Sequence, residues 1–345
     1  MTGKRSELHR KATISDVAAR AGVSIKTVSR VLNREPKVRA TTRDRVESAM
    51  QELRYRPNSP GRMLASRRSY ILGLVYNANS SYINSIQNGA LEACRQDHYD
   101  LLIHPCHYRD PAITDEIADL VTGAKVDGLI LVPPVADVAE VRALLRDLDV
   151  PTVSISRSSG ATDDLAVGTN DRQACAALTA HLAGLGHRRI AFVQGHPDHK
   201  AMASRYRGYL DGMAAAGLAI ESAYVVQGDN TFASGVRCAT GLFDGVPPSA
   251  IFCANDHMAA GVMAVAHERG LAIPGDVSIA GFDDIPLASQ IWPTLTTIRQ
   301  PLREMAVLAA SMLIRRLRNR DAEQVTRIVE STLVLRDSTG RAPNA

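Results

Sequence analysis

From residue 70 onward, short apolar segments alternate with amphipathic helical patterns, and this alternation restricts the fold more than any other feature. The first apolar segment, ILGLVY at 71–76, is typical of a strand buried on both faces of a parallel sheet. Strands that alternate with helices predict an α/β fold with parallel sheets. About ten strands over this length fit two doubly wound lobes better than one sheet. In such lobes a ligand binds beyond the carboxyl ends of the strands, so two facing lobes predict one shared cleft.

A different pattern occupies residues 13–33, TISDVAARAGVSIKTVSRVLN. Thr13 can cap a first helix with Asp16 as its capping-box partner, and Gly22 can supply the left-handed turn that ends it. Ser24 can cap a second helix with an apolar inner face. This pattern fits a helix-turn-helix whose second helix enters a major groove, but it also fits a plain helical hairpin. The outward residues of the second helix are Ile25, Lys26, Ser29, Arg30 and Asn33.

The distribution of charge favours the DNA-binding interpretation. Residues 1–69 hold 17 lysines and arginines against 6 aspartates and glutamates, while the rest of the 345-residue chain has a net negative charge. A basic small domain beside an acidic large one indicates a polyanionic partner for the first domain alone. We expect residues 1–11 to form a disordered basic arm.

The segment after the first two helices predicts a third helix and a linker. Thr41 or Thr42 can cap a helix that runs to about Leu53. Residues 58–69 then predict a helix of about two turns, which would be marginal alone because nucleation is unfavourable. Leu64 lies among arginines there and fits a minor-groove wedge, although an ordinary interdomain linker is the alternative.

Several other classes of protein are disfavoured. The five cysteines are scattered without a C-x-x-C pair, which is typical of reduced thiols in a cytoplasmic protein. No apolar run approaches the ~18 residues of a membrane span, and the N-terminus has no secretory apolar core. The sequence contains none of the common nucleotide-binding, metalloprotease or serine-hydrolase motifs, so we expect no enzyme activity and no cofactor. His196, Asp198 and His199 share one loop, which we interpret as solvated rather than as a metal site.

Motifs along the chain resemble those of the lac repressor (LacI/GalR) family of bacterial transcription regulators. The resemblance runs in order from about residue 13 to residue 336. The matching motifs are DVA (16–18), AGVS (21–24), TVSRVLN (27–33), YRPN (55–58), GLGHRRIA (184–191), RYRGY (205–209), AND (254–256), GFDD (281–284) and PTLTTI (293–298).

The resemblance implies a domain order and an assembly. It implies a helix-turn-helix headpiece over 1–57, a hinge helix over 58–69 and an effector-binding and dimerisation core over 70–345. The core is expected to resemble periplasmic sugar-binding proteins, with lobes of about 70–167 plus 298–321 and 168–297 plus 322–340. It also implies a homodimer on a near-palindromic operator. The C-terminal tail has no leucine heptads, which disfavours a coiled-coil tetramer.

The resemblance further implies which residues contact DNA. Ile25, Lys26 and Arg30 match base-reading positions, and Leu64 matches an intercalating hinge leucine beside the small Ala65. Ile25 is apolar where many relatives carry a polar or aromatic group. The full predicted set is Thr13, Ser24, Ile25, Lys26, Thr27, Ser29, Arg30, Asn33, Asn58, Leu64 and Ala65.

In the cleft, Arg205 matches a position that often grips the effector, and Asp256 follows a strand where it could accept sugar hydroxyl protons. We interpret Asp283 and Asp284 as turn residues. Mixed carboxylate, guanidinium, amide and aromatic groups suit a neutral polyol better than a phosphate or a purine. The full predicted effector-binding set is Asn77, Ser81, Tyr82, Arg157, Arg205, Asn230, Phe232, Asp256, Phe282 and Trp292.

These features predict a repressor that a small carbohydrate releases from its operator through a two-state change in the lobes. The opposite sign remains open, in which a purine-like or other small ligand acts as corepressor. The alternative from another class is a carbohydrate-binding transport protein, which the basic N-terminal domain disfavours. The effector and the operator sequence are not predicted.

Overall fold

The computed structural model describes residues 12–32, 38–53, 55, 68–78, 80–155, 165–320 and 325–343. The chain divides into two compact units, Met1–Tyr70 and Ile71–Ala345. Some predictions fall outside the described residues: the arm over 1–11, all of the hinge helix up to residue 67 with Asn58, Leu64 and Ala65, and the contact residues Asn33 and Arg157. None of the described helices is long and apolar enough to cross a membrane.

The first unit contains three helices, α1 (Ile14–Ala21), α2 (Ile25–Leu32) and α3 (Ala40–Glu52). They enclose a small core to which Val17, Val28 and Val46 contribute fully buried side chains, one from each helix. The predicted α1 cap is confirmed, because the Asp16 N–H donates to Thr13 Oγ1 (3.3 Å) and the Thr13 N–H donates to Asp16 Oδ2 (2.7 Å). Gly22 has φ 64° at the turn. The third helix begins at Ala40 without a side-chain cap, so the predicted caps at residues 41 and 42 are wrong.

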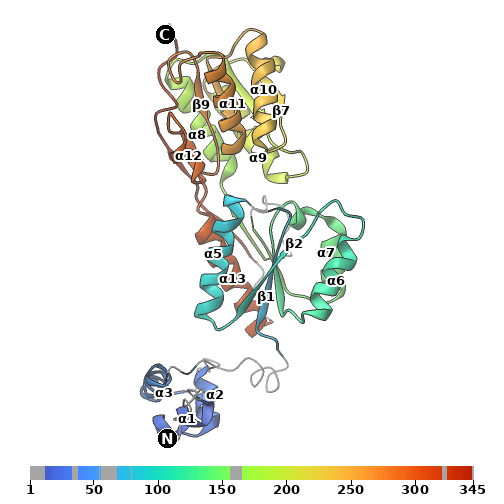
Figure 1. The fold of residues 1–345 in the computed structure, drawn as a ribbon, viewed down its shortest axis with the longest axis vertical. Helices are drawn as coiled ribbons and strands as arrows, with labels where there is room; N and C mark the ends of the chain where they lie inside the picture. The colour runs from blue at the N-terminus through green and yellow to red at the C-terminus, as the bar shows by residue number, and fades with distance from the viewer. Residues whose placement is uncertain are drawn as a thin grey trace, which may run out of the picture. The chain divides into compact units, whose positions relative to one another are not determined.

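The second unit begins with a six-stranded sheet of order β11-β5-β4-β3-β1-β2, in which every pair is parallel (Figure 1). Helices α5 (Ser81–Gln96) and α13 (Leu302–Arg318) pack together on one face, and α6 (Ile113–Gly123) and α7 (Ala139–Asp147) cover the other. The strands are β1 (Ile71–Tyr76), β2 (Asp100–Pro105), β3 (Gly128–Leu131), β4 (Thr152–Ile155), β5 (Leu165–Thr169) and β11 (Thr326–Val329).

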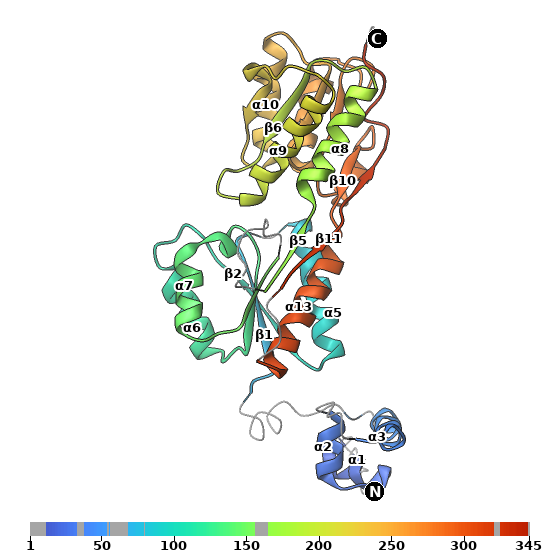
Figure 2. The ribbon, with the colours of Figure 1, turned by 180° about the vertical axis from the view of Figure 1, so that it is seen from behind.

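A second lobe is built on a four-stranded parallel sheet of order β7-β6-β8-β9. Helix α8 (Asp171–Gly184) packs against α9 (Lys200–Ala215) (Figure 2), and α10 (Phe232–Asp244) packs against α11 (Asp256–Glu268) (Figure 1). The strands are β6 (Ile190–Gln194), β7 (Val225–Gln227), β8 (Ala250–Cys253) and β9 (Ser278–Ala280). Shorter elements are η1 (Val135–Asp137), η2 (Ser222–Tyr224) and α12 (Leu287–Gln290).

The chain crosses between the lobes after β5, after β10 (Thr297–Arg299) and between β11 and β12 (Thr332–Val334). Strands β10 and β12 form an antiparallel pair. The predicted lobe boundaries need two corrections here. Strand β11 lies beside β5 in the first lobe, although residues 322–340 were assigned to the second. Ile298 packs in the second lobe's core, although the first lobe was expected to resume there.

Candidate functional site

The exposed face of α2 is the candidate DNA-reading surface of the first unit. Val28 and Val31 face the core, whereas Lys26 and Arg30 are exposed and Ile25 is 50% exposed. The helix start is fixed by Ser24, whose hydroxyl oxygen accepts from the backbone N–H of Thr27 (3.1 Å). Thr27 and Ser29 are half-buried on the same helix. Thr13 is committed to the α1 cap through Asp16, and any DNA contact there would have to use the same hydroxyl.

In the second unit, Arg205 on α9 is the centre of a buried polar cluster. Its side chain is 4% exposed, its Nε donates to Asp171 Oδ2 (3.0 Å), and its Nη1 donates to the Ala254 carbonyl (2.6 Å). Asp283 Oδ1 lies 3.3 Å from the same Nη1. The guanidinium carbon lies 3.7 Å from the centre of the Phe282 ring, so the ring face makes a cation–π contact with the charged group. The structure therefore gives Phe282, which is fully buried, a role in supporting Arg205.

The electrostatics of this cluster follow from its burial. Burial alone would lower the pKa of Arg205, but Asp283 and Asp171 raise it above its usual range. Burial raises the pKa of Asp283 to about 6, although Arg205 and the Gln300 amide, which donates to Asp283 Oδ1 (2.6 Å), act to lower it. The guanidinium thus stays charged, and the Asp283 carboxylate begins to take up a proton as the pH falls toward about 6.

Asp256, the first residue of α11, is fully buried in a different environment. Its Oδ1 accepts from Thr297 Oγ1 (2.6 Å) and its Oδ2 accepts from the Ile285 N–H (2.9 Å). Burial and the nearby Asp283 raise the pKa of Asp256. In this structure both carboxylate oxygens of Asp256 bind protein groups and brace the 281–285 segment against α11.

Sequence reasoning missed Asp283 and Asp171 as partners of Arg205. Asp283 (φ 110°) and Asp284 (φ 54°) both have positive φ, but Asp283 forms an isolated β-bridge with Arg299 rather than the turn predicted for it. Asp284 binds Arg299 and Arg336, each at 2.6 Å, whereas Asp283 also faces Arg205. The two aspartates have the same local pattern, so only the fold distinguishes their roles.

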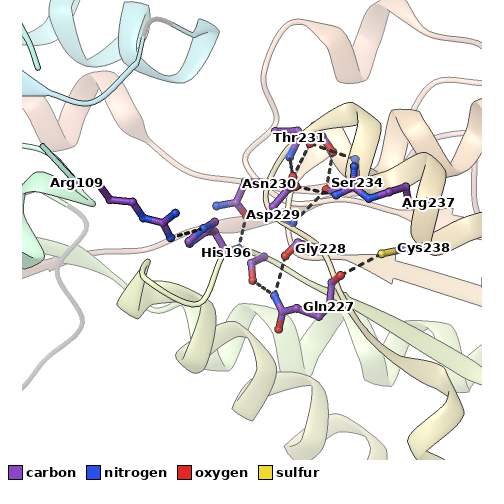
Figure 3. Close-up of polar contacts among 11 residues, drawn as sticks. Arg109, His196, Gln227, Gly228, Asp229, Asn230, Thr231, Ser234, Arg237 and Cys238 are labelled. Atoms are coloured by element: carbon purple, nitrogen blue, oxygen red, sulfur yellow. Dashed lines mark hydrogen bonds and ion pairs between the residues drawn. The ribbon is translucent and has the colours of Figure 1, made fainter. Parts of the chain in front are cut away.

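A hydrogen-bonded chain links the loop after β6 to the start of α11, and Figure 3 shows its first contact, between His196 and Asn230. Asn230, at φ 71°, accepts the His196 N–H on Oδ1 (3.2 Å), and its carbonyl accepts from Asn255 Nδ2 (2.9 Å). Asn255 Oδ1 in turn caps α11 by accepting from the Met258 N–H (2.9 Å). Asn230 thus shapes the cleft-side loop, and Asn255 is a member of the site that sequence reasoning did not select.

The remaining predicted effector residues occupy varied positions. Asn77 Oδ1 accepts from the Tyr108 N–H (3.4 Å) beside β1. Ser81 and Tyr82 are half-buried in the first turn of α5. Phe232 begins α10 and is 47% exposed, and Trp292 is 79% exposed beyond α12.

A pocket of about 530 Å³ adjoins the Arg205 cluster through Asp283 and Gln300. Residues of both lobes line it, including Ser85 of α5, Arg299 beside β12, and Pro301 and Leu302 at the start of α13. Within the described ranges, no three His, Cys, Asp or Glu side chains converge as metal ligands would.

Comparison with known proteins agrees with this organisation. Residues 13–58 match the family described as bacterial regulatory proteins of the lacI family, and residues 179–339 match a periplasmic binding protein-like domain. The transcriptional regulator GalR of Escherichia coli (strain K12) is 31% identical over 329 residues, which is 95% of each chain. The transcriptional repressor CytR of the same strain is 32% identical over 358 residues, covering 99% of this chain and 100% of CytR.

Solved structures show the same likeness. A complex of the transcriptional regulator CelR with cellobiose superposes with a TM-score of 0.73 at 29% identity, covering 95% of this chain and 99% of CelR. The lac repressor dimer bound to operator and the anti-inducer ONPF superposes with a TM-score of 0.73 at 27% identity, covering 96% of this chain and 100% of that chain. With its helix-turn-helix and two-lobed core, the chain belongs to the LacI family of bacterial regulatory proteins and is a DNA-binding transcriptional repressor, not an enzyme.

Proposed function

We propose that this repressor binds a near-palindromic operator as a homodimer and is released by a small, uncharged carbohydrate that binds between the lobes. Cytoplasmic action follows from binding chromosomal DNA. We propose that the residues predicted from the sequence to contact DNA do so, and that Ile25, Lys26 and Arg30 on the exposed face of α2 read the bases. The hinge residues Leu64 and Ala65 are proposed from the resemblance alone.

The observation that carries the effector proposal is the pairing of Arg205 with two carboxylates, Asp171 and Asp283. A guanidinium that is already balanced by two acids offers little attraction to a phosphate or carboxylate ligand. Carboxylate oxygens do accept hydrogen bonds from hydroxyl groups, and Asp283 is 8% exposed beside the pocket. CelR, solved with cellobiose, is a relative of the same fold that binds a neutral sugar.

Thermal shift with matched ligands tests this charge argument. A ligand that binds only the folded state stabilises it by RT ln(1 + [L]/Kd), so the melting temperature rises once the ligand concentration exceeds Kd. We expect neutral mono- or disaccharides to include a stabilising ligand, and the corresponding sugar phosphates and uronates to have no effect. Stabilisation by the anionic sugars alone would refute the neutral effector.

Substitution on α2 tests the DNA-reading surface. Each lost base contact should weaken specific binding by about 1–3 kcal/mol, so Lys26→Ala and Arg30→Ala should each lower operator affinity about 5- to 160-fold. The matched control is Arg20→Ala in α1, which removes a basic side chain that pairs with Glu52 of α3. Equal discrimination between operator and scrambled DNA in all three variants would show that α2 does not read bases.

A further inference from the structure

Two segments of the first lobe meet a single segment of the second lobe, residues 196–200, which runs from the loop after β6 to the first residue of α9. Tyr108 and Arg109 follow β2, and both bind Asp198 across the lobes. The Tyr108 hydroxyl donates to Asp198 Oδ2 (2.8 Å), and Arg109 donates to the same oxygen from Nε (3.1 Å) and Nη2 (2.7 Å). A second ion pair joins Lys200 Nζ to Asp137 Oδ1 in η1 (3.7 Å).

The charges on the two sides are complementary. In the second lobe, the acidic Asp198 faces Arg109 of the first lobe. Two residues later, the basic Lys200 faces Asp137 of the first lobe. The hydrogen bonds from Arg109 and Tyr108 lower the pKa of Asp198, so the carboxylate is ionised at neutral pH. Three donor hydrogens on one oxygen hold this contact more firmly than an isolated surface pair would be held.

Asp198, rather than His196, is the attractive group for Arg109. The Asp198 N–H donates to His196 Nδ1 (3.1 Å), so in the neutral ring Nε2 carries the proton. Arg109 Nη2 lies 3.1 Å from that Nε2, and Figure 3 shows this contact reaching from the first lobe to the second. A guanidinium N–H facing an imidazole N–H places two donors together, which adds no attraction.

We propose that Tyr108, Arg109 and Asp198, supported by Lys200 and Asp137, form an electrostatic clasp that holds the lobes closed when no effector is bound. The segment that carries Asp198 is tied to the interior, because the His196 N–H binds Asn230 and Asn230 binds Asn255. The clasp thus joins the first lobe to the same residues that shape the effector site. The strength of the clasp therefore sets the fraction of molecules whose cleft is open. This role does not depend on the identity of the ligand that the cleft binds.

Pulsed electron paramagnetic resonance on the full chain measures this fraction directly. Spin labels at Glu140→Cys and Ala233→Cys occupy exposed positions in the first turns of α7 and α10, on opposite lobes, in a Cys238→Ser background. The other four cysteines are buried. Asp198→Asn should raise the ratio of open to closed distances by about threefold to fivefold, the size expected when an exposed ion pair is lost.

Two controls make the result specific. Asp211→Asn removes an equally exposed bidentate pair with Arg172 that lies within the second lobe, and it should leave the distances unchanged. The double variant Arg109→Gln/Asp198→Asn should open the lobes no further than Asp198→Asn alone, because both changes remove one contact. In 1 M salt, where the Debye length falls to about 3 Å and exposed ion pairs are weakened, the distances in the unmodified chain should shift toward those of Asp198→Asn.

An unchanged distance distribution in Asp198→Asn, with native circular dichroism, would overturn the clasp. An equal shift in Asp211→Asn would overturn it as well, because the effect would then come from lost surface charge and not from the interlobe contact.

Discussion

Arg205 is the residue whose removal should damage the fold most among the charged groups of the second lobe. Arg205→Ala leaves Asp171 and Asp283 buried without their shared cation, and breaking a buried pair in this way costs about 3–5 kcal/mol. We therefore expect a large fall in the urea concentration at the midpoint of unfolding. The control is Arg172→Ala, which loses only an exposed pair with Asp211 and should unfold at nearly the same urea concentration as the unmodified protein. Similar midpoints for Arg205→Ala and Arg172→Ala would mean that Arg205 is not a structural charge.

His199 should make stability depend on pH. Burial, with smaller contributions from His196 and Arg205, lowers the pKa of His199 from 6.5 to about 4. The unfolded chain therefore binds a proton at a higher pH than the folded chain does. Stability from this group is complete above pH 6.5 and is lost as the pH falls from 6.5 toward 4.

The measurement is the melting temperature between pH 7.5 and 4.5, compared with that of His199→Gln. Asp283 acts in the opposite sense, since its raised pKa favours the folded state as the pH falls below about 6. The difference between the two proteins isolates the histidine. We expect the unmodified protein to lose more stability than the variant on acidification, and parallel curves would contradict the assignment.

For single residues, the sequence could predict that Arg205 belongs to the site but not which side chains bind it. Arg205 could be selected from the RYRGY motif, but its partners come from the start of α8 and from the segment after β9. Asp171 has no distinctive local pattern, and Asp283 shares the pattern of its neighbour Asp284. Asp256 looked equally available from sequence, yet Thr297 and the Ile285 N–H occupy its carboxylate.

Among the elements, the crossing of α8 and α9 depends on a close approach at Gly208. A Cβ added there would meet the Arg172 carbonyl oxygen and lie 2.6 Å from the Cys175 Cβ. Gly208→Ala should lower stability by about 1–3 kcal/mol through overpacking, despite the better helix propensity of alanine. Gly241 in α10 has open space at the same position, so Gly241→Ala should raise stability by about 0.5–1 kcal/mol. A denaturant titration of both variants checks the prediction: the two changes in stability should have opposite signs, and stabilisation by both would contradict the packing at Gly208.

Apolar patterning along the sequence predicts the buried helices and strands but not the exposed edge strand. The helix-turn-helix and the parallel-sheet core predicted from the sequence are confirmed. Buried strands such as β1 and β8 carry continuous apolar runs, so they could be found locally. Strand β11 (TRIV) is an edge strand with three exposed residues, and only its pairing with β5 identifies it. Its place in the first lobe therefore could not be read from the sequence.

For the whole molecule, the basic first 69 residues and the net negative charge of the remainder separate two tasks, DNA binding and ligand sensing. Each unit could be predicted from its own pattern, because caps, turns and apolar periodicity are local. The interlobe contacts could not, because Arg109 and Asp198 are 89 residues apart and neither lies in a matched motif.

The central claim is that an uncharged sugar between the lobes controls the affinity for DNA. Fluorescence anisotropy of labelled DNA from upstream of the protein's own gene, titrated with neutral mono- and oligosaccharides, tests it most directly. One such sugar should weaken binding by the unmodified chain at least about tenfold, a coupling of about 1.4 kcal/mol. Asp283→Asn should bind the DNA equally well and need more sugar for release. Release by a nucleoside or a sugar acid alone, or tighter DNA binding in the presence of the sugar, would contradict the account.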